Sequence, residues 1–302
     1  MAAKNPIFKT APYLVFPTLM GGALASTYLQ MHWGTQPATA ALISVLIFGF
    51  AAIPVLERLL PYRPQWNQND SDLKPDIIYM VFNAFIPRLW TPVQIFALTA
   101  ITAWLGTQLD TQLWPQDWPL LVDLFLMLLI AEFGRYWVHF AAHKTDWLWR
   151  LHAVHHSPNR LYFLNANRFH PLEKLIFQIP EVAPFVLLGT PVEVIAMYFT
   201  FNGIHGLTQH SNIHIKGGVL NYVFSLTELH RWHHSQKIEE SDRNFGNNLI
   251  VWDMVFGTFF HPKNREVETI GLLNPEYPKT VSGQLVAPFA KRDISKPEGW
   301  QK

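Results

Sequence analysis

The stretch AALISVLIFGFAAIPVLERLL, residues 40–60, is apolar over almost its whole length. An α-helix needs about 20 such residues to cross the hydrocarbon core of a bilayer, so this stretch predicts a membrane-spanning helix. Three more stretches of similar length and character lie at 13–31, 84–105 and 119–138. Because the chain is also 49% hydrophobic and 14% aromatic, we expect an all-α integral membrane bundle with about four spans.

The distribution of positive charge in the short loops predicts the orientation of these spans. Lysine and arginine precede the first span and follow the second and the fourth, at Lys4, Lys9, Arg58, Arg63, Lys74, Lys144 and Arg150. The opposite loops, 32–39 and 106–118, contain neither residue. Since positive loops stay in the cytoplasm, the N-terminus and everything after the fourth span are expected to be cytoplasmic. Arg88 interrupts the entry to the third span, which is therefore the least sharply bounded.

A fifth apolar region, residues 175–201, is expected to dip into the membrane and return as a hairpin. Pro180, Pro184 and the turn signal Gly-Thr-Pro at 189–191 divide it into pieces that are short for a span. A single crossing would also place the histidine clusters on either side of it on opposite faces of the bilayer. We therefore divide the chain into a transmembrane region, 1–138, and a cytoplasmic histidine-rich helical cap, 139–302, that includes this hairpin.

Charge and cysteine content exclude several classes of function. Lys and Arg total 23 against 22 for Asp and Glu, so no basic field is available to attract nucleic acid. The chain has no cysteine. Disulfides, thiolate zinc sites and cysteine-ligated iron–sulfur clusters are therefore excluded within this chain, and nitrogen and oxygen atoms must hold any metal ion.

Histidine is concentrated in four short clusters. The chain has 14 histidines, and ten of them lie in HFAAH, in two copies of His-x-x-His-His, and in QHSNIH: His139, His143, His152, His155, His156, His210, His214, His230, His233 and His234. Spacings of three and four place side chains on one face of an α-helix, so each cluster is expected to aim several imidazoles at a common point. One metal ion takes four to six ligands, and this number of histidines indicates two metal ions roughly 4 Å apart.

Less specific interpretations apply to individual residues. HFAAH alone is common by chance, and His214 fits the start of a polar loop equally well. His205 and His170 are each either partners of ligand histidines or ordinary polar residues. Glu132 and Asp242 are candidate partners of ligand histidines, but a buried hydrogen-bonding role for Glu132 and a loop-capping role for Asp242 stay open. The stretch after Asp242, which reads NNLIVWDMVFGTFF, is expected to pack the cap.

The wider sequence around these clusters resembles the fatty acid hydroxylase/sterol desaturase superfamily. The resemblance covers about 130–262 and rests on AEFGRYWVHFAAHK, LHAVHHSPNRLYFLNANRFHP, NGIHGLTQHSN, LHRWHHSQ and DRNFGNNLIVWDMVFGTFFHP. It implies a non-haem centre of two iron ions held by histidine, which activates O2 to attack a C–H bond of a lipid. By position it implies the ligands His139, His143, His152, His155, His156, His210, His230, His233 and His234, with His214 as a tenth candidate. No catalytic side chain beyond the metal centre is expected.

This resemblance favours a membrane-bound lipid hydroxylase or desaturase whose substrate enters from the bilayer. Zinc has no redox chemistry and does not suit that reaction. The chain has no Rossmann glycine fingerprint and no cysteine set, so a separate electron donor of ferredoxin or cytochrome type, with its reductase, is expected. The alternative is a histidine-rich metal-binding or metal-transporting membrane protein, although a transporter would hold its ligands near mid-bilayer. A bis-histidine haem carrier is a third possibility, and a zinc protease is disfavoured because the chain lacks His-Glu-x-x-His.

Overall fold

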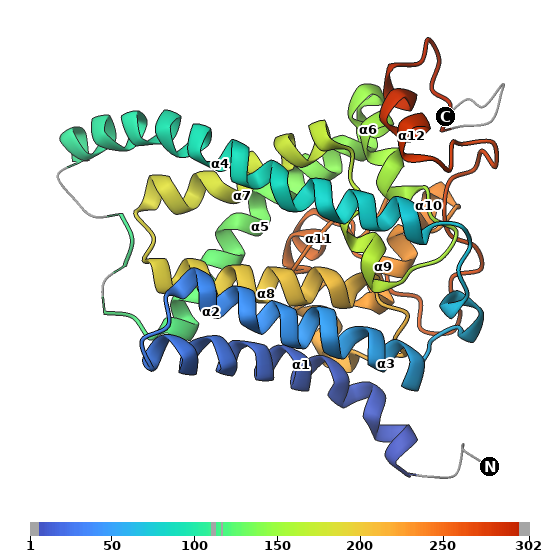
Figure 1. The fold of residues 1–302 in the computed structure, drawn as a ribbon, viewed down its shortest axis with the longest axis horizontal. Coiled ribbons are helices and arrows are strands. Elements are labelled where there is room, and N and C mark those ends of the chain that lie inside the picture. The colour runs from blue at the N-terminus through green and yellow to red at the C-terminus, as the bar shows by residue number, and fades with distance from the viewer. Residues whose placement is uncertain (1–5, 110–112, 116, 296–302) are drawn as a thin grey trace.

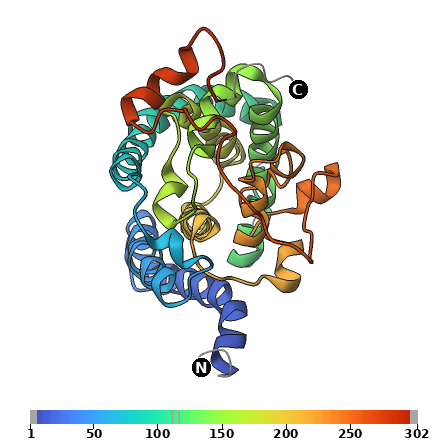
Figure 2. The same cartoon turned by 90° about the vertical axis from the view of Figure 1, so that its right-hand side faces the viewer.

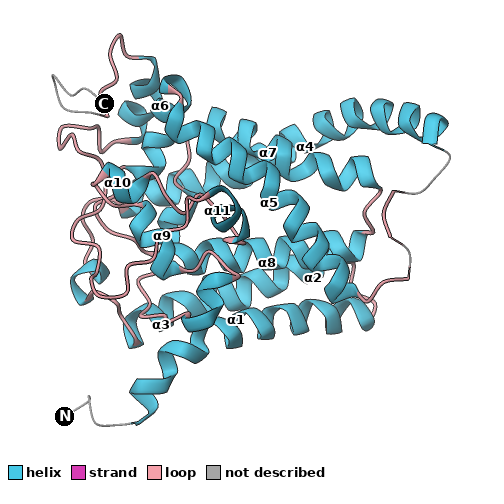
Figure 3. Ribbon diagram, turned by 180° about the vertical axis from the view of Figure 1, so that it is seen from behind, coloured by secondary structure: helices cyan, strands magenta, loops and turns pink. Residues whose placement is uncertain are grey.

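Most of the long helices have nearly parallel axes, and short helices gather toward one end of the molecule (Figure 1). The computed structural model describes residues 6–109, 113–115 and 117–295. Within those residues the regular elements are helices, and strand pairing is limited to three isolated bridges. Figure 3, coloured by secondary structure, shows the same helices joined by loops at the two ends of the bundle. The prediction of an all-α fold is therefore confirmed for the described residues.

One layer of the bundle contains the first helices and the last long one. Helix α1 (Pro6–His32) lies beside a continuous helix made of α2 (Pro37–Ser44), the π-helical η2 (Val45–Ala52) and α3 (Ile53–Leu59), and both contact α8 (Val192–His210). Buried hydroxyl groups join the layer, because Thr27 of α1 and Thr200 of α8 share a hydrogen bond of 2.9 Å. The middle of α8 is thereby held against α1.

The other layer is built from α4 (Leu73–Leu109) and α7 (Pro171–Leu188), which run side by side (Figure 1), with α5 (Leu120–Lys144) between the layers. Helix α4 continues unbroken past Arg88, so the charge that interrupts the apolar run does not break the helix. Helices α5 and α7 approach closely at Gly134, where an added Cβ would lie 2.7 Å from Cβ of Pro180. Only a glycine fits between these two helices without a shift of the backbone.

The expected hairpin turn occurs at Gly189, but its two arms are longer than the sequence suggested. Gly189 adopts a left-handed conformation with φ 66° and ends α7, and α8 begins two residues after Thr190. Pro180 and Pro184 do not break the first arm, because both lie inside α7. Contacts with α4 and α5 hold α7 in helical form despite the missing amide donors.

Among the described residues, one helix is both long enough and apolar enough to cross a membrane. It is Pro37–Leu59, with 23 residues and a mean hydropathy of 2.4. Large apolar side chains also face outward from other long helices, and the most exposed are Leu89 (78%) and Phe96 (83%) of α4. Such surface is unusual for a protein surrounded only by water.

The histidine-rich clusters lie together at one end of the bundle, which faces the viewer in Figure 2. The short helices toward that end include α6 (Asp146–His156), α9 (Thr227–His233), α10 (Ile238–Ser241) and α12 (Val281–Val286), with the 3-10 helices η3 (Pro64–Asn67), η4 (Phe163–Asn167), η5 (Gly218–Tyr222) and η6 (Ala287–Phe289). Helix α11 (Val251–Phe256) packs against α5 nearer the middle of the bundle (Figure 1). Two ion pairs, Arg160 with Asp72 and Arg168 with Asp76, fasten the loop after α6 to the region where α4 begins. The end of the bundle is thereby closed by loops that are anchored to long helices.

Candidate metal centre

Nine of the ten candidate ligands converge in two adjacent groups of buried side chains. The first histidine group is His139, His143, His152, His156 and His233. The second histidine group is His155, His210, His230 and His234. Within each group one nitrogen per ring lies within 4.8 Å of all the others. Groups of five and four imidazoles match the ligand number of a single metal ion each.

The two His-x-x-His-His triplets are divided between the groups, which corrects the expectation that each cluster aims at one point. His152 and His156, one helical turn apart, point into the first group, whereas His155 points into the second. Neighbouring residues of a helix diverge by about 100°, so adjacent histidines cannot face the same point. The second triplet is divided the other way: His233 points into the first group, and His230 and His234 point into the second.

Main-chain carbonyls fix the orientation of several rings. Four rings donate a hydrogen bond from Nδ1 to a carbonyl oxygen: His139 to Phe245 (2.7 Å), His155 to Arg168 (3.2 Å), His210 to Gly206 (3.4 Å) and His233 to Arg243 (2.8 Å). A carbonyl can only accept, so Nδ1 carries the proton of each neutral ring. The other nitrogen, Nε2, then holds a lone pair that points into the group.

These lone pairs face one another at distances that call for a cation between them. Nε2 of His155 and Nε2 of His210 are 3.2 Å apart, yet neither has a proton to donate. Further contacts of 3.0–3.2 Å between Nε2 atoms join His139 with His152, His152 with His156, His210 with His230, and His230 with His234. Two imidazole nitrogens about 2.0–2.1 Å from one metal ion such as zinc would lie about 2.9–3.4 Å apart. The residues present therefore fit a bound metal ion in each group.

Burial keeps these imidazoles neutral, which is the form that binds metal. The loss of hydration, together with the charge of the neighbouring His152, lowers the pKa of His233 to about 3. Burial is also the main cause that holds the pKa of His143, His155 and His156 well below the usual value for histidine. In addition, Nε2 of His233 is buried and has no hydrogen-bond partner among the described residues. An unpaired buried acceptor of this kind is costly unless a ligand satisfies it.

The loop after α10 orients three rings of the first group. Asp242 lies 3.2 Å from Nδ1 of His143 through one carboxylate oxygen, and the next residues supply the carbonyls for His233 and His139. Asp242 thus contacts the outer nitrogen of a candidate ligand histidine. Asp253 of α11 holds this loop in turn, because its carboxylate accepts the amides of Phe245 (2.8 Å) and Gly246 (2.7 Å).

Glu173 lies at the site and was not predicted from the sequence. Its carboxylate lies 2.5 Å from Nδ1 of His152, and both side chains are buried. A carboxylate on the outer nitrogen fixes the ring and makes it a stronger ligand. The residue comes 21 positions later, in the first turn of α7, so no local spacing rule connects it with the triplet. A buried acidic residue at the start of an apolar helix was the one available signal.

The remaining candidates lie outside both groups. His214 is exposed, with its ring 6.2 Å from that of Tyr62. His170 caps α7 by accepting from the amide of Leu172, and His205 packs its ring against aromatic side chains of α1 and α8. Glu132 accepts the amides of Asn247 and Asn248, so it has the buried hydrogen-bonding role.

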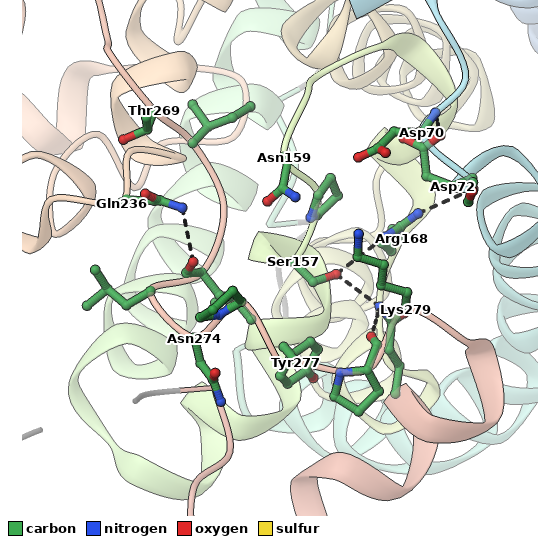
Figure 4. Close-up of a pocket in the computed structure, with 18 of the residues that line it drawn as sticks. Asp70, Asp72, Ser157, Asn159, Arg168, Gln236, Thr269, Asn274, Tyr277 and Lys279 are labelled. Carbon is green, nitrogen blue, oxygen red and sulfur yellow. Dashed lines mark hydrogen bonds between the residues drawn. The ribbon is translucent and has the colours of Figure 1, made fainter. Parts of the chain in front are cut away.

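Among the cavities at this end of the bundle, a small one of about 50 Å³ touches the first histidine group alone, through His143 and His156. A cavity of about 140 Å³, the metal-facing cavity, touches both histidine groups through His139, His152, His155, His210 and His230. A wider cleft of about 580 Å³, drawn in Figure 4, lies between the loop after α6 and the segment 268–284. Figure 4 labels Ser157, Asn159 and Gln236 among its walls, and none of the nine histidines lines it. The metal-facing cavity is therefore the space in which a molecule can reach both groups.

Comparison with known proteins supports the same reading of the site. The profile of the family described as "Fatty acid hydroxylase" matches residues 124–258, which contain all nine histidines. Ornithine lipid hydroxylase OlsE of Rhizobium tropici is 34% identical over 298 residues, or 96% of this chain and 87% of that protein. Alkylglycerol monooxygenase of Homo sapiens is 30% identical over 178 residues, 58% of this chain and 38% of that protein.

A more distant relative is the very-long-chain aldehyde decarbonylase GL1-8 of Oryza sativa subsp. japonica, 28% identical over 145 residues, 47% of this chain and 53% of that protein. No solved structure matches this chain. The similarity to the Rhizobium enzyme extends over nearly the whole chain, including the helices that precede His139, the first residue of the two histidine groups. The chain belongs to the fatty acid hydroxylase/sterol desaturase superfamily.

Proposed function

We propose that this protein is an O2-dependent lipid hydroxylase in which each histidine group holds one iron ion. The observation that carries the proposal is the convergence of Nε2 lone pairs, such as those of His155 and His210, which face each other at 3.2 Å. Family relatives named as a lipid hydroxylase and a monooxygenase support the type of reaction. Iron ions held by the two groups would supply the activation of O2: electrons from an external donor reduce O2, and one of its oxygen atoms is inserted into a C–H bond of the lipid.

The chain's own residues hold the ligands in position for this chemistry. Glu173 and Asp242 fix the outer nitrogens of His152 and His143, so their rings need no reorientation when a metal ion binds. Hydroxylation of a C–H bond consumes one O2, two electrons and two protons, and it yields an alcohol and water. The sequence has no cysteine set and no Rossmann glycine fingerprint. We therefore assign the supply of these electrons to a separate ferredoxin or cytochrome with its reductase.

The lipid enters from a bilayer in this proposal. Exposed apolar side chains on α4, such as Leu89 and Phe96, and the apolar helix Pro37–Leu59 support a membrane location. We retain the arrangement of four spans with the hairpin α7–α8 dipping between them, and the N-terminus and the histidine groups on the cytoplasmic side. An external electron donor can react with the histidine groups only if they lie on a side of the membrane that is accessible to it.

The test is the metal content of detergent-purified protein followed by turnover. About two irons per chain are expected, and the double variant His155→Ala with His233→Ala, one ligand from each group, should lose both. The parent protein should then incorporate one atom of 18O from 18O2 into a lipid when it is given a reductase and its donor, and the double variant should not.

The metal-binding or metal-transporting alternative predicts a different outcome. In that case the protein would bind metal ions and either release them or carry them across a vesicle membrane. No lipid would gain an oxygen atom when O2 and electrons are supplied. Zinc in place of iron after expression would establish the site but not the reaction, so reconstitution with Fe²⁺ under anaerobic conditions precedes the turnover assay. A protein that holds two irons and never oxidises a lipid would contradict the proposed function.

A further inference from the structure

The metal-facing cavity contains one cationic side chain, Lys174, that no described residue contacts through an ion pair or a hydrogen bond. Its lining includes two cations, Arg135 and Lys174, and no Asp or Glu. The guanidinium of Arg135 is neutralised by Glu181, at 2.9 Å, and it also donates to Asn247. The ammonium of Lys174 has no ion pair and no hydrogen bond among the described residues. Its charge is therefore available to a molecule in the cavity.

Lys174 lies close to the candidate metal positions. It directly follows Glu173, which holds His152, in the first turn of α7. Its Nζ lies 5.8 Å from the centre of the Phe169 ring, and that ring stacks on His155 at 4.3 Å between centroids. One aromatic ring thus separates the ammonium from a ligand of the second histidine group.

The size and lining of the cavity suit a small polar group. Its volume of about 140 Å³ corresponds to roughly five water molecules, at about 30 Å³ each, and it is below the roughly 300 Å³ at which pockets begin to enclose whole drug-sized ligands. Amide side chains from three elements also line it, at Asn167, Asn202 and Asn247. A long acyl chain does not fit this space, whereas the headgroup of a lipid does.

We propose that Lys174 binds an oxyanion of the substrate headgroup, a carboxylate or a phosphate, inside the metal-facing cavity. This inference rests on the proposed function, because it assumes that the cavity receives the lipid that is oxidised. A partly buried ammonium without a partner carries a desolvation cost, and charge-assisted hydrogen bonds to an oxyanion offset it. Lys174 is then a specificity-determining residue that selects acidic lipids over neutral ones and places the headgroup next to both histidine groups.

The experiment measures binding without turnover. Zinc-loaded protein in a neutral detergent is titrated with dodecanoate, dodecyl phosphate or dodecanol, which share one chain and differ in headgroup, against a displaced fluorescent lipid. The parent should bind one or both anions at least about tenfold more tightly than the alcohol. Tighter binding of dodecanoate identifies a carboxylate headgroup, and tighter binding of dodecyl phosphate identifies a phosphate.

Variants separate Lys174 from the charge of the metal ions. Lys174→Met should weaken the binding of the preferred anion about tenfold and leave dodecanol unchanged, Lys174→Arg should retain most of the preference, and the exposed control Lys263→Met should behave as the parent. An undiminished preference in Lys174→Met overturns the inference, and so does equal binding of all three lipids by the parent, which needs no variant to fold. Because no oxidation is measured, a lack of hydroxylase activity would contradict the proposed function while this preference was still observed.

Discussion

His155 and His156 are neighbours in the chain, and their imidazoles belong to different histidine groups. The ring of His156 meets His234 of the other triplet at 4.5 Å between centroids, and that residue belongs with His155. The two groups are thus interlocked through two pairs of adjacent residues, one on α6 and one at the end of α9.

This interlocking predicts which double variants remove one metal ion and which remove two. His156→Ala with His233→Ala changes two triplets but one group, so about one metal ion per chain should remain. His155→Ala with His156→Ala changes a single triplet but both groups, and almost no metal should remain. Elemental analysis after gel filtration distinguishes them. The reverse pattern, with almost no metal in His156→Ala/His233→Ala and about one metal ion in His155→Ala/His156→Ala, would mean that each triplet serves one site.

Replacing Glu173 should weaken metal binding at the first histidine group. The carboxylate holds Nδ1 of His152, and loss of such a partner costs about 10–100-fold in metal affinity. Glu173→Ala should show the larger effect, and Glu173→Gln, which keeps an acceptor, the smaller one. Competition with a chelator measures the affinity. The exposed Glu193→Gln is the control, and an effect of equal size there would contradict a specific role for Glu173.

Asp76→Ala should destabilise the protein strongly. Asp76 pairs with Arg168 and accepts from the hydroxyl of Tyr162 at 2.6 Å, all in buried surroundings. Its removal leaves a buried guanidinium without a partner, at a cost of about 3–5 kcal/mol in the free energy of unfolding. The matched control is Asp146→Ala, whose pair with Arg150 is exposed and should change the free energy by less than about 1 kcal/mol.

The same Asp76 variant should also affect metal binding. Arg168 supplies the carbonyl that orients His155, so a looser Arg168 weakens the second histidine group. Chemical denaturation in detergent and metal analysis are carried out on the same preparations. A fully metallated Asp76→Ala protein of unchanged stability would show that this ion pair has no positioning role.

Gly246→Ala should disturb the loop that orients the first histidine group. An added Cβ at this position would lie 2.3 Å from the carbonyl oxygen of Leu249, which main-chain atoms cannot relieve without moving. The carbonyl of the preceding Phe245 would move with it and loosen His139. We expect lower metal content and a lower melting temperature. Gly21→Ala in α1, where nothing lies within 4 Å of the new Cβ, should leave both unchanged.

Local spacing made most of the site predictable from the sequence. Intervals of three and four residues identify histidines that share a helix face, and all nine residues implied by the family resemblance converge in the structure. The division of each triplet was not predictable in the same way. Helix geometry shows that His155 and His156 face different points, but which other histidines join each of them depends on where the other helices lie.

The contacts that orient the rings were also beyond the sequence. Carbonyl acceptors such as that of Phe245 are present at every position, so they carry no compositional signal. Within the fold, the turn at Gly189 was predictable because glycine before a proline-containing segment marks a helix end. The continuity of α7 through Pro180 was not, because packing against α4 and α5 decides it.

The interlocked triplets also determine when the centre can form during synthesis of the chain. Each group takes at least one ligand from the last cluster, at residues 230–234, while the others come from as early as His139. A ribosome must therefore have made at least 233 residues before the first group, and 234 before the second, possesses its full set of nitrogens. Metal loading is a late event that ties the middle and last thirds of the polypeptide together, and chains truncated before that cluster are released without either complete group.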